Sequence, residues 1–167
     1  HQTATVRSAY SQGGAGIKIG VISDGVENID LSKSTGDLPA EVIVLDDSYR
    51  TADGDDEGTA MLEIIHDMVP DAKLYFHTGF PNSIVFNNAV DDLVAAGVDV
   101  IVDDLGFFDQ PYFEDGPDGK IASHIASILA TNNIVFVSAA GNDAQKHYQG
   151  DYYNDGINYH DFSRGSQ

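Results

Sequence analysis

Apolar runs alternate with segments of helical periodicity along most of this chain. The expected strands are the Val- and Ile-rich runs at 17–22, 41–45, 73–77, 98–103 and 134–138. Apolar residues spaced three and four apart predict helices at about 57–68, 84–96 and 120–131, and a short helix is expected around 3–10. Strands separated by single helices predict right-handed crossovers and a three-layer α/β/α fold with a mostly parallel, doubly wound sheet.

The same pattern divides the chain into three parts. Residues 1–14 are expected to form an N-terminal arm, residues 15–145 the α/β core, and residues 146–167 an irregular polar tail. The tail shows neither helical nor strand periodicity, and we expect it to lead into further chain. Because the sequence starts at His1 without a methionine, we also expect a processed or trimmed product.

Composition excludes several classes of protein and site. The 167 residues are enough for one domain with a sizeable core, and no apolar run approaches the 18 residues of a membrane span. The net charge is −19, from 27 acidic and 8 basic residues, so nucleic acid and anionic membranes are not expected partners. The absence of cysteine excludes disulfides and thiolate metal sites. Oligomeric state is left open.

Polar residues follow the expected strands where a doubly wound sheet places its ligands. These candidates are Asp24, the pair Asp46 and Asp47, the pair Asp103 and Asp104, and Asn142. Glu57 opens a helix at the same edge. Its spacing to the apolar stripe of Ala60, Met61, Ile64, Ile65 and Met68 predicts that it points inward, toward the sheet.

Three chemistries could use such a cluster. Clustered carboxylates hold Mg²⁺ for phosphoryl transfer, or share a proton as a general acid and base. Alternatively, one carboxylate serves as base to a nucleophile while an Asn amide stabilises an oxyanion. A calcium site on the acidic loops is compatible with any of these, and its position is not predicted.

The order of the motifs resembles the first part of a subtilase catalytic domain, in the subtilisin and sedolisin superfamily of serine peptidases (S8/S53). The blocks are Ile-Gly-Val-Ile-Ser-Asp-Gly at 19–25, Glu-Gly-Thr-Ala-Met at 57–61 with Val-Pro-Asp-Ala at 69–72, Val-Ile-Val-Asp-Asp-Leu-Gly at 100–106, and Ser-Ala-Ala-Gly-Asn at 138–142. Together they span about residues 15 to 145 in the family's order.

This resemblance implies a subtilisin-like fold and peptide-bond hydrolysis through an acyl-enzyme. Glu57 would act as the base, Asp24 or Ser23 would orient it, and Asn142 would donate to the oxyanion. The implied walls of the substrate site are Asp104, Leu105, Gly106, Ala139, Ala140 and Gly141. The resemblance also implies a peptide or protein substrate, no required cofactor, and secretion.

The chain departs from the family at three places. The family's histidine position holds Glu57; sedolisins also use a glutamate, but their partner aspartate lies where this chain has Met61. An ungapped alignment places Ser23 on the catalytic aspartate, so Asp24 needs a local bulge or turn to point inward. The nucleophile block Gly-Thr-Ser-x-Ala-x-Pro is absent, so this fragment alone is expected to be inactive, with the serine encoded beyond residue 167.

Two further expectations follow from the residue types. A carboxylate base is efficient only near its own pKa. We therefore expect an acidic pH optimum for an enzyme that uses Glu57. Asp104, at the wall of the site, would favour a substrate with a basic side chain.

Two alternative functions remain. One is a non-catalytic subtilase relative that uses the fold to bind a partner. The other is a Mg²⁺-dependent phosphotransfer or receiver-like domain that uses Asp24, Asp46, Asp47 and Asp104.

Overall fold

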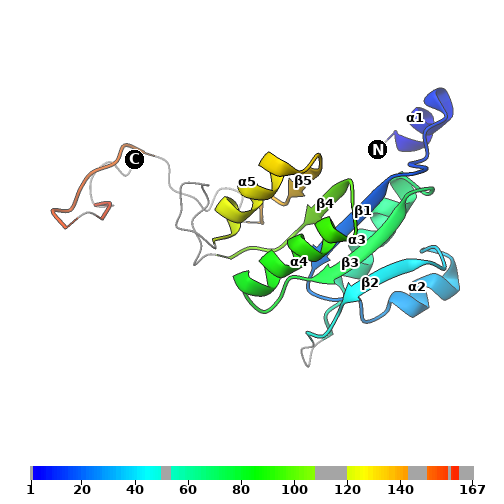
Figure 1. Cartoon of the computed structure of the whole chain (residues 1–167), viewed down its shortest axis with the longest axis horizontal. Coiled ribbons are helices and arrows are strands. Elements are labelled where there is room, and N and C mark those ends of the chain that lie inside the picture. The colour runs from blue at the N-terminus through cyan, green and yellow to red at the C-terminus, as the bar shows by residue number, and fades with distance from the viewer. Residues whose placement is uncertain (1, 50–53, 108–119, 143–149, 158, 162–167) are drawn as a thin grey trace.

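The computed structural model describes residues 2–49, 54–107, 120–142, 150–157 and 159–161. Its centre is a five-stranded parallel sheet with helices on both faces, which confirms the three-layer α/β/α fold (Figure 1). The strands are β1 (Lys18–Ser23), β2 (Val42–Asp46), β3 (Lys73–Thr78), β4 (Val100–Asp103) and β5 (Val135–Ser138). The helices are α1 (Thr3–Tyr10), α2 (Ile29–Thr35), α3 (Glu57–Met68), α4 (Ser83–Ala95) and α5 (Ile121–Thr131).

Each face of the sheet carries its own hydrophobic core. Along β1, Ile19 and Val21 pack into a cluster that receives Leu62 from α3 and Ile29 from α2. Ile22 points to the opposite face, where the buried side chains of α4 and the partly buried apolar side chains of α5 form the second cluster. This alternation follows from the two-residue period of a strand. Helices α2 and α3 therefore share one face of the sheet, and α4 and α5 share the other.

The strand order is β2-β3-β1-β4-β5, and it gives one crossover an unusual hand. The connection from β1 to β2 runs across the sheet in one direction over the α2/α3 face. The next connection, from β2 through α3 to β3, runs back in the opposite direction over that same face. It therefore has the opposite hand to the other three crossovers, although about 98% of such connections in proteins share one hand. The expectation of uniformly right-handed crossovers is wrong for this unit.

Helix α3 begins and ends at the predicted residues, but its buried face differs from the prediction. Gly58, Thr59 and Leu62 are buried, while Ile64 is 61% exposed. Glu57 is exposed as well, so the prediction of an inward-pointing carboxylate is wrong. The apolar stripe chosen from the sequence lies partly on the solvent side because Gly and Thr, which are not strongly apolar, make the closest approach to the sheet.

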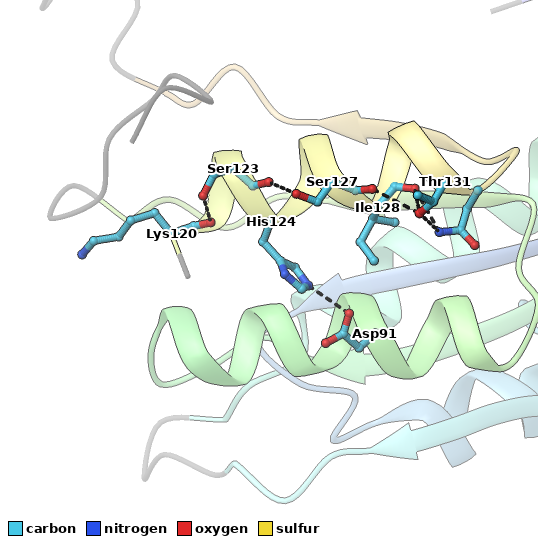
Figure 2. Close-up of polar contacts among 8 residues, drawn as sticks. Asp91, Lys120, Ser123, His124, Ser127, Ile128 and Thr131 are labelled. Carbon is cyan, nitrogen blue, oxygen red and sulfur yellow. Dashed lines mark hydrogen bonds and ion pairs between the residues drawn. The ribbon is translucent and has the colours of Figure 1, made fainter. Parts of the chain in front are cut away.

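Helices α4 and α5 are joined by a polar contact as well as by their apolar residues. His124 Nε2 of α5 lies 2.9 Å from Asp91 Oδ1 of α4 (Figure 2). The hydroxyl groups of Ser123 and Ser127 instead bind carbonyl groups of their own helix, at Lys120 and Ser123 respectively. His124 thus adds a polar tie between the two helices of this layer.

Within the described residues, the N-terminal arm and the C-terminal tail form no strand of the sheet. In the N-terminal arm, α1 lies near the end of α3, where Arg7 donates hydrogen bonds to the carbonyl groups of Asp67 and Met68. In the described part of the tail, Asn154 and His160 form an isolated antiparallel bridge. The sequence pattern did not predict α2, a seven-residue helix that ends at Thr35 and is capped by Gly36. Within the described ranges, none of the helices is both long and apolar enough to cross a membrane.

Candidate active site

The candidate site lies at the carboxyl edge of the sheet, where β1 and β4 are neighbours. The connection that leaves β1 runs toward β2 over the α2/α3 face, whereas the one that leaves β4 runs toward β5 over the α4/α5 face. Two adjacent strands with divergent connections form a topological switch point, where open α/β sheets bind their ligands. Asp24 follows β1 and Asp104 follows β4. The fold therefore brings two of the predicted carboxylates to this point.

Asp24 is held against the first turn of α3. Its Oδ1 atom accepts hydrogen bonds from the backbone amides of Glu57 at 2.9 Å and Gly58 at 3.3 Å. Strand β1 ends at Ser23, so the chain turns at Asp24 and its carboxylate reaches the helix, as the sequence required. An anion at this position satisfies amides that have no partner inside the helix and favours the positive end of the helix dipole.

The segment before α3 is fastened to the loop that follows β1. Asp56 accepts hydrogen bonds from the backbone and side-chain nitrogens of Asn28, at 2.9 and 3.0 Å, and from the Thr59 hydroxyl at 2.6 Å. Partial burial disfavours the charged form, but these three hydrogen bonds outweigh it and lower the pKa of Asp56. The start of α3 is thus fixed from both sides, by Asp24 and by Asp56.

Gly58 allows α3 to approach the sheet closely. A Cβ atom at this position would meet a ring carbon of Phe76 on β3 and would lie 2.6 Å from the carbonyl oxygen of Gly25. No side chain fits in that space without a shift of the helix. The Gly-Thr pair that follows Glu57 is therefore a packing requirement at this helix end.

Asp104 joins the same group of carboxylates from the neighbouring strand. The hydroxyl of Ser23, which is fully buried, lies 3.5 Å from Asp24 Oδ1, and its interaction with the Asp104 carboxyl group favours the charged form of that group. Burial, together with the negative charges of Glu57 and Asp24, raises the pKa of Asp104 to about 6 against the effect of the Ser23 hydroxyl. Glu57 itself is exposed, and no hydrogen bond to its carboxylate is formed within the described part of the chain. Ser23 and Asp24, the two positions weighed from the sequence, both lie next to this group.

Asp103 lies beside Asp104 in the chain but on the other face of the sheet. Its side chain is 3% exposed and follows Ile101 on the α4/α5 face. Burial raises the pKa of Asp103 to about 6, although hydrogen bonds from the Ser138 hydroxyl and the Leu105 amide favour its charged form. Asp103 is among the candidates predicted from the sequence, but no specific role was predicted for it.

The two segments expected to flank a substrate are adjacent. Strands β4 and β5 pair in parallel with Asp103 opposite Ser138, and the Ala139 amide donates to the Asp103 carbonyl at 3.0 Å. Gly141 has a φ of 79°, a left-handed conformation that favours glycine. Asn142 follows it and is exposed. The segments 104–106 and 139–142 thus leave two adjacent strand ends, while no described contact joins Asn142 to the carboxylates near α3.

The acidic residues of this region do not form a cluster of metal ligands within the described part of the chain. The described residues contain no group of three or more His, Asp or Glu side chains arranged to hold a metal ion. Asp46 binds the amide and hydroxyl of Ser48, at the end of β2. Strand β2 is three positions from β4, or about 14 Å at the usual strand spacing. Asp46 and Asp104 are therefore too far apart to share one Mg²⁺ ion.

Sequence reasoning missed one residue that shapes the site. The hydroxyl of Thr78, at the end of β3, donates to the Asp24 carbonyl at 2.8 Å, and the Gly79 amide donates to the Ser23 carbonyl at 2.9 Å. These bonds fix the turn that redirects Asp24 toward α3. A Thr at the end of an apolar strand was the available signal, but its partner lies 54 residues away in the sequence.

No protein-family model matches this chain, and no curated protein shows significant similarity to it.

Proposed function

We propose that this chain is the N-terminal part of the catalytic domain of a subtilase-like serine endopeptidase with a glutamate base. The observation that carries the proposal is the hydrogen bond from the Glu57 amide to the Asp24 carboxylate at the β1/β4 switch point. It joins the first and second motif blocks in one site, although they are 33 residues apart in sequence. The third block runs through β4 and beyond its end, and the fourth begins at the last residue of the neighbouring strand β5.

In this proposal the role of each residue follows from its position in the fold. Glu57, exposed on the first turn of α3, takes the proton from a serine that lies outside this chain. Asp24 orients Glu57 by fixing the backbone of that turn, and Asn142 donates to the oxyanion of the acyl-transfer step. Segments 104–106 and 139–141 supply backbone groups that pair with an extended peptide.

The carboxylate group also bears on pH and specificity. A carboxylate base is efficient only near its own pKa, and we propose an acidic pH optimum for the enzyme. The negative charge of Asp104 would favour substrates with a basic side chain near the scissile bond. No cofactor is required by this chemistry.

The strand order does not favour the receiver-like alternative. Flavodoxin-like receiver domains have the order 2-1-3-4-5, whereas this sheet has β2-β3-β1-β4-β5. A non-catalytic binding module with the same fold is the alternative that the experiment must separate from an enzyme.

The test is to read the encoding gene beyond the codon for residue 167 and to assay the complete product against peptides from pH 3 to pH 8. A Gly-Thr-Ser-x-Ala-x-Pro block and hydrolysis with an acidic optimum would support the peptidase. A block without its serine, or a complete product that binds peptides without cleaving them, would support the binding module. Activity that rises steadily through pH 8 would contradict a glutamate base.

A further inference from the structure

One buried carboxylate oxygen connects the ends of the two neighbouring strands β4 and β5. Asp103 Oδ1 accepts a hydrogen bond from the Leu105 amide at 3.3 Å and another from Ser138 Oγ at 3.2 Å. Leu105 lies on the segment that leaves β4, and Ser138 is the last residue of β5. A side chain that is 3% exposed therefore bridges the starts of two separate segments.

We propose that Asp103 is a positioning residue that fixes segment 104–106 relative to segment 139–142. The inference rests on the proposed function, in which these segments form the two walls of the peptide site and carry Asn142. Asp103 touches neither substrate nor reacting atoms, and it acts through the backbone that it holds.

The two hydrogen bonds at Oδ1 hold two different segments of the chain. The bond to Leu105, two residues ahead, is a local turn contact that directs the chain as it leaves the strand. The bond from Ser138 crosses between strands and adds to the backbone bond from Ala139 to the Asp103 carbonyl. The β5 end is thus held by Asp103 at two points, immediately before the segment that ends in Asn142.

Protonation of Asp103 at its second oxygen, Oδ2, weakens the two hydrogen bonds at Oδ1 without breaking them. Oδ2 is buried and has no hydrogen-bond partner within the described ranges, so a proton at Oδ2 leaves both bonds at Oδ1 in place. Those bonds are stronger when the carboxylate is charged. The charged neighbour that acts on Asp103 is Asp104. Two further titratable pairs lie on the α4/α5 face: Asp91 of α4 with His124 of α5 (Figure 2), and Asp92 of α4 with His77 of β3 at 3.2 Å. His77 shares a row of the sheet with Asp103, because both are in register with Ile22 of β1.

The test uses nuclear magnetic resonance of the 167-residue chain, with amide chemical shifts followed from pH 4 to pH 8. We expect the amides of Leu105 and of residues 139–142 to titrate together with the Asp103 carboxyl carbon. Asp103→Asn should abolish this shared titration, while the same change one residue on, Asp104→Asn, should preserve it. Ser138→Ala should preserve the response at Leu105 and reduce that of residues 139–142 by at least half.

A second readout is amide hydrogen exchange at Ala139, which we expect to accelerate about tenfold in Ser138→Ala because the strand end loses one of its two ties. This variant also tests the bridge if Asp103→Asn does not fold. Amides of residues 139–142 that follow Asp104, or that titrate unchanged in Asp103→Asn, would overturn the inference. None of these measurements depends on peptide hydrolysis, so a chain that lacks peptidase activity could still show the bridge, and an active enzyme could still lack it.

Discussion

The carboxylate of Asp24 accepts a hydrogen bond from the backbone amide of Glu57, 33 residues further along the chain, at 2.9 Å. Through this bond the end of the central strand determines where α3 begins. Any role of Glu57 in chemistry therefore depends on a residue that contacts its backbone and not its carboxylate.

Asp24→Ala should lower the free energy of unfolding by about 1–2 kcal/mol, as loss of an acceptor at a helix N-terminus does. The amides of Glu57 and Gly58 would lose their partner, and the helix dipole its anion. Urea unfolding at pH 7 measures the change. Glu41→Ala, which removes an exposed carboxylate outside the helices, is the control and should stay within about 0.5 kcal/mol of the wild type. Equal stability of the two variants would contradict the capping role.

Gly58→Ala should destabilise the chain by about 1–3 kcal/mol, because the new methyl group collides with Phe76 and with the Gly25 carbonyl. Gly106→Ala is a matched control, since a Cβ atom there has no neighbour within 4 Å. Thermal unfolding compares the two. If Gly58→Ala proved as mild as Gly106→Ala, the close approach of α3 to β3 would be wrong.

Ser23→Ala should raise the pKa of Asp104 above its value of about 6, because the lost hydrogen bond favours the charged form of the carboxyl group. Titration of the Asp104 carboxyl carbon by nuclear magnetic resonance measures the shift. Ser127→Ala, on the distant helix α5, should leave the titration unchanged. A lower or equal pKa in Ser23→Ala would show that Ser23 does not hold Asp104.

The stability of the chain should depend on the protonation of Asp103. Its pKa is raised by burial to about 6 in the folded state, from an ordinary value near 4, so the folded state binds the proton more tightly than the unfolded state. This contribution to stability is fully present below about pH 4, is lost between about pH 4 and 6, and stays lost above. The free energy of unfolding of the wild type should therefore fall relative to that of Asp103→Asn as pH rises through that window.

Urea unfolding at half-unit steps of pH from 3.5 to 7.5 tests this dependence. A difference between wild type and Asp103→Asn that does not vary with pH would show that Asp103 keeps an ordinary pKa in the folded chain.

Much of the fold follows from the sequence because the apolar periodicity is strong. The predicted helix at 57–68 coincides with α3, and the five predicted strands all occur with ends shifted by one or two residues. Periodicity could not reveal the strand order or the unusual hand of the β2–α3–β3 crossover, because both depend on which strands pair over long range. Periodicity also predicted the wrong buried face for α3, because Gly58 packs closely against the sheet without being strongly apolar.

The candidate site was predictable in location but not in detail. Acidic residues after Ser23 and Val102 mark the carboxyl edge of adjacent strands, and the structure brings Asp24 and Asp104 together there. The sequence could not assign opposite faces of the sheet to Asp103 and Asp104, because the end of β4 determines where the alternation stops.

The proposal that Glu57 activates a serine nucleophile is tested most directly by labelling the complete natural gene product with a serine-directed fluorophosphonate. The modified residue is then mapped. We expect a label on a single serine beyond residue 167, within a Gly-Thr-Ser-x-Ala-x-Pro block. In Glu57→Gln the labelling rate should fall by about 10²–10⁴-fold, the usual contribution of a general base. A product that takes up no label, or that labels equally fast in Glu57→Gln, would contradict the proposal that Glu57 activates a serine nucleophile.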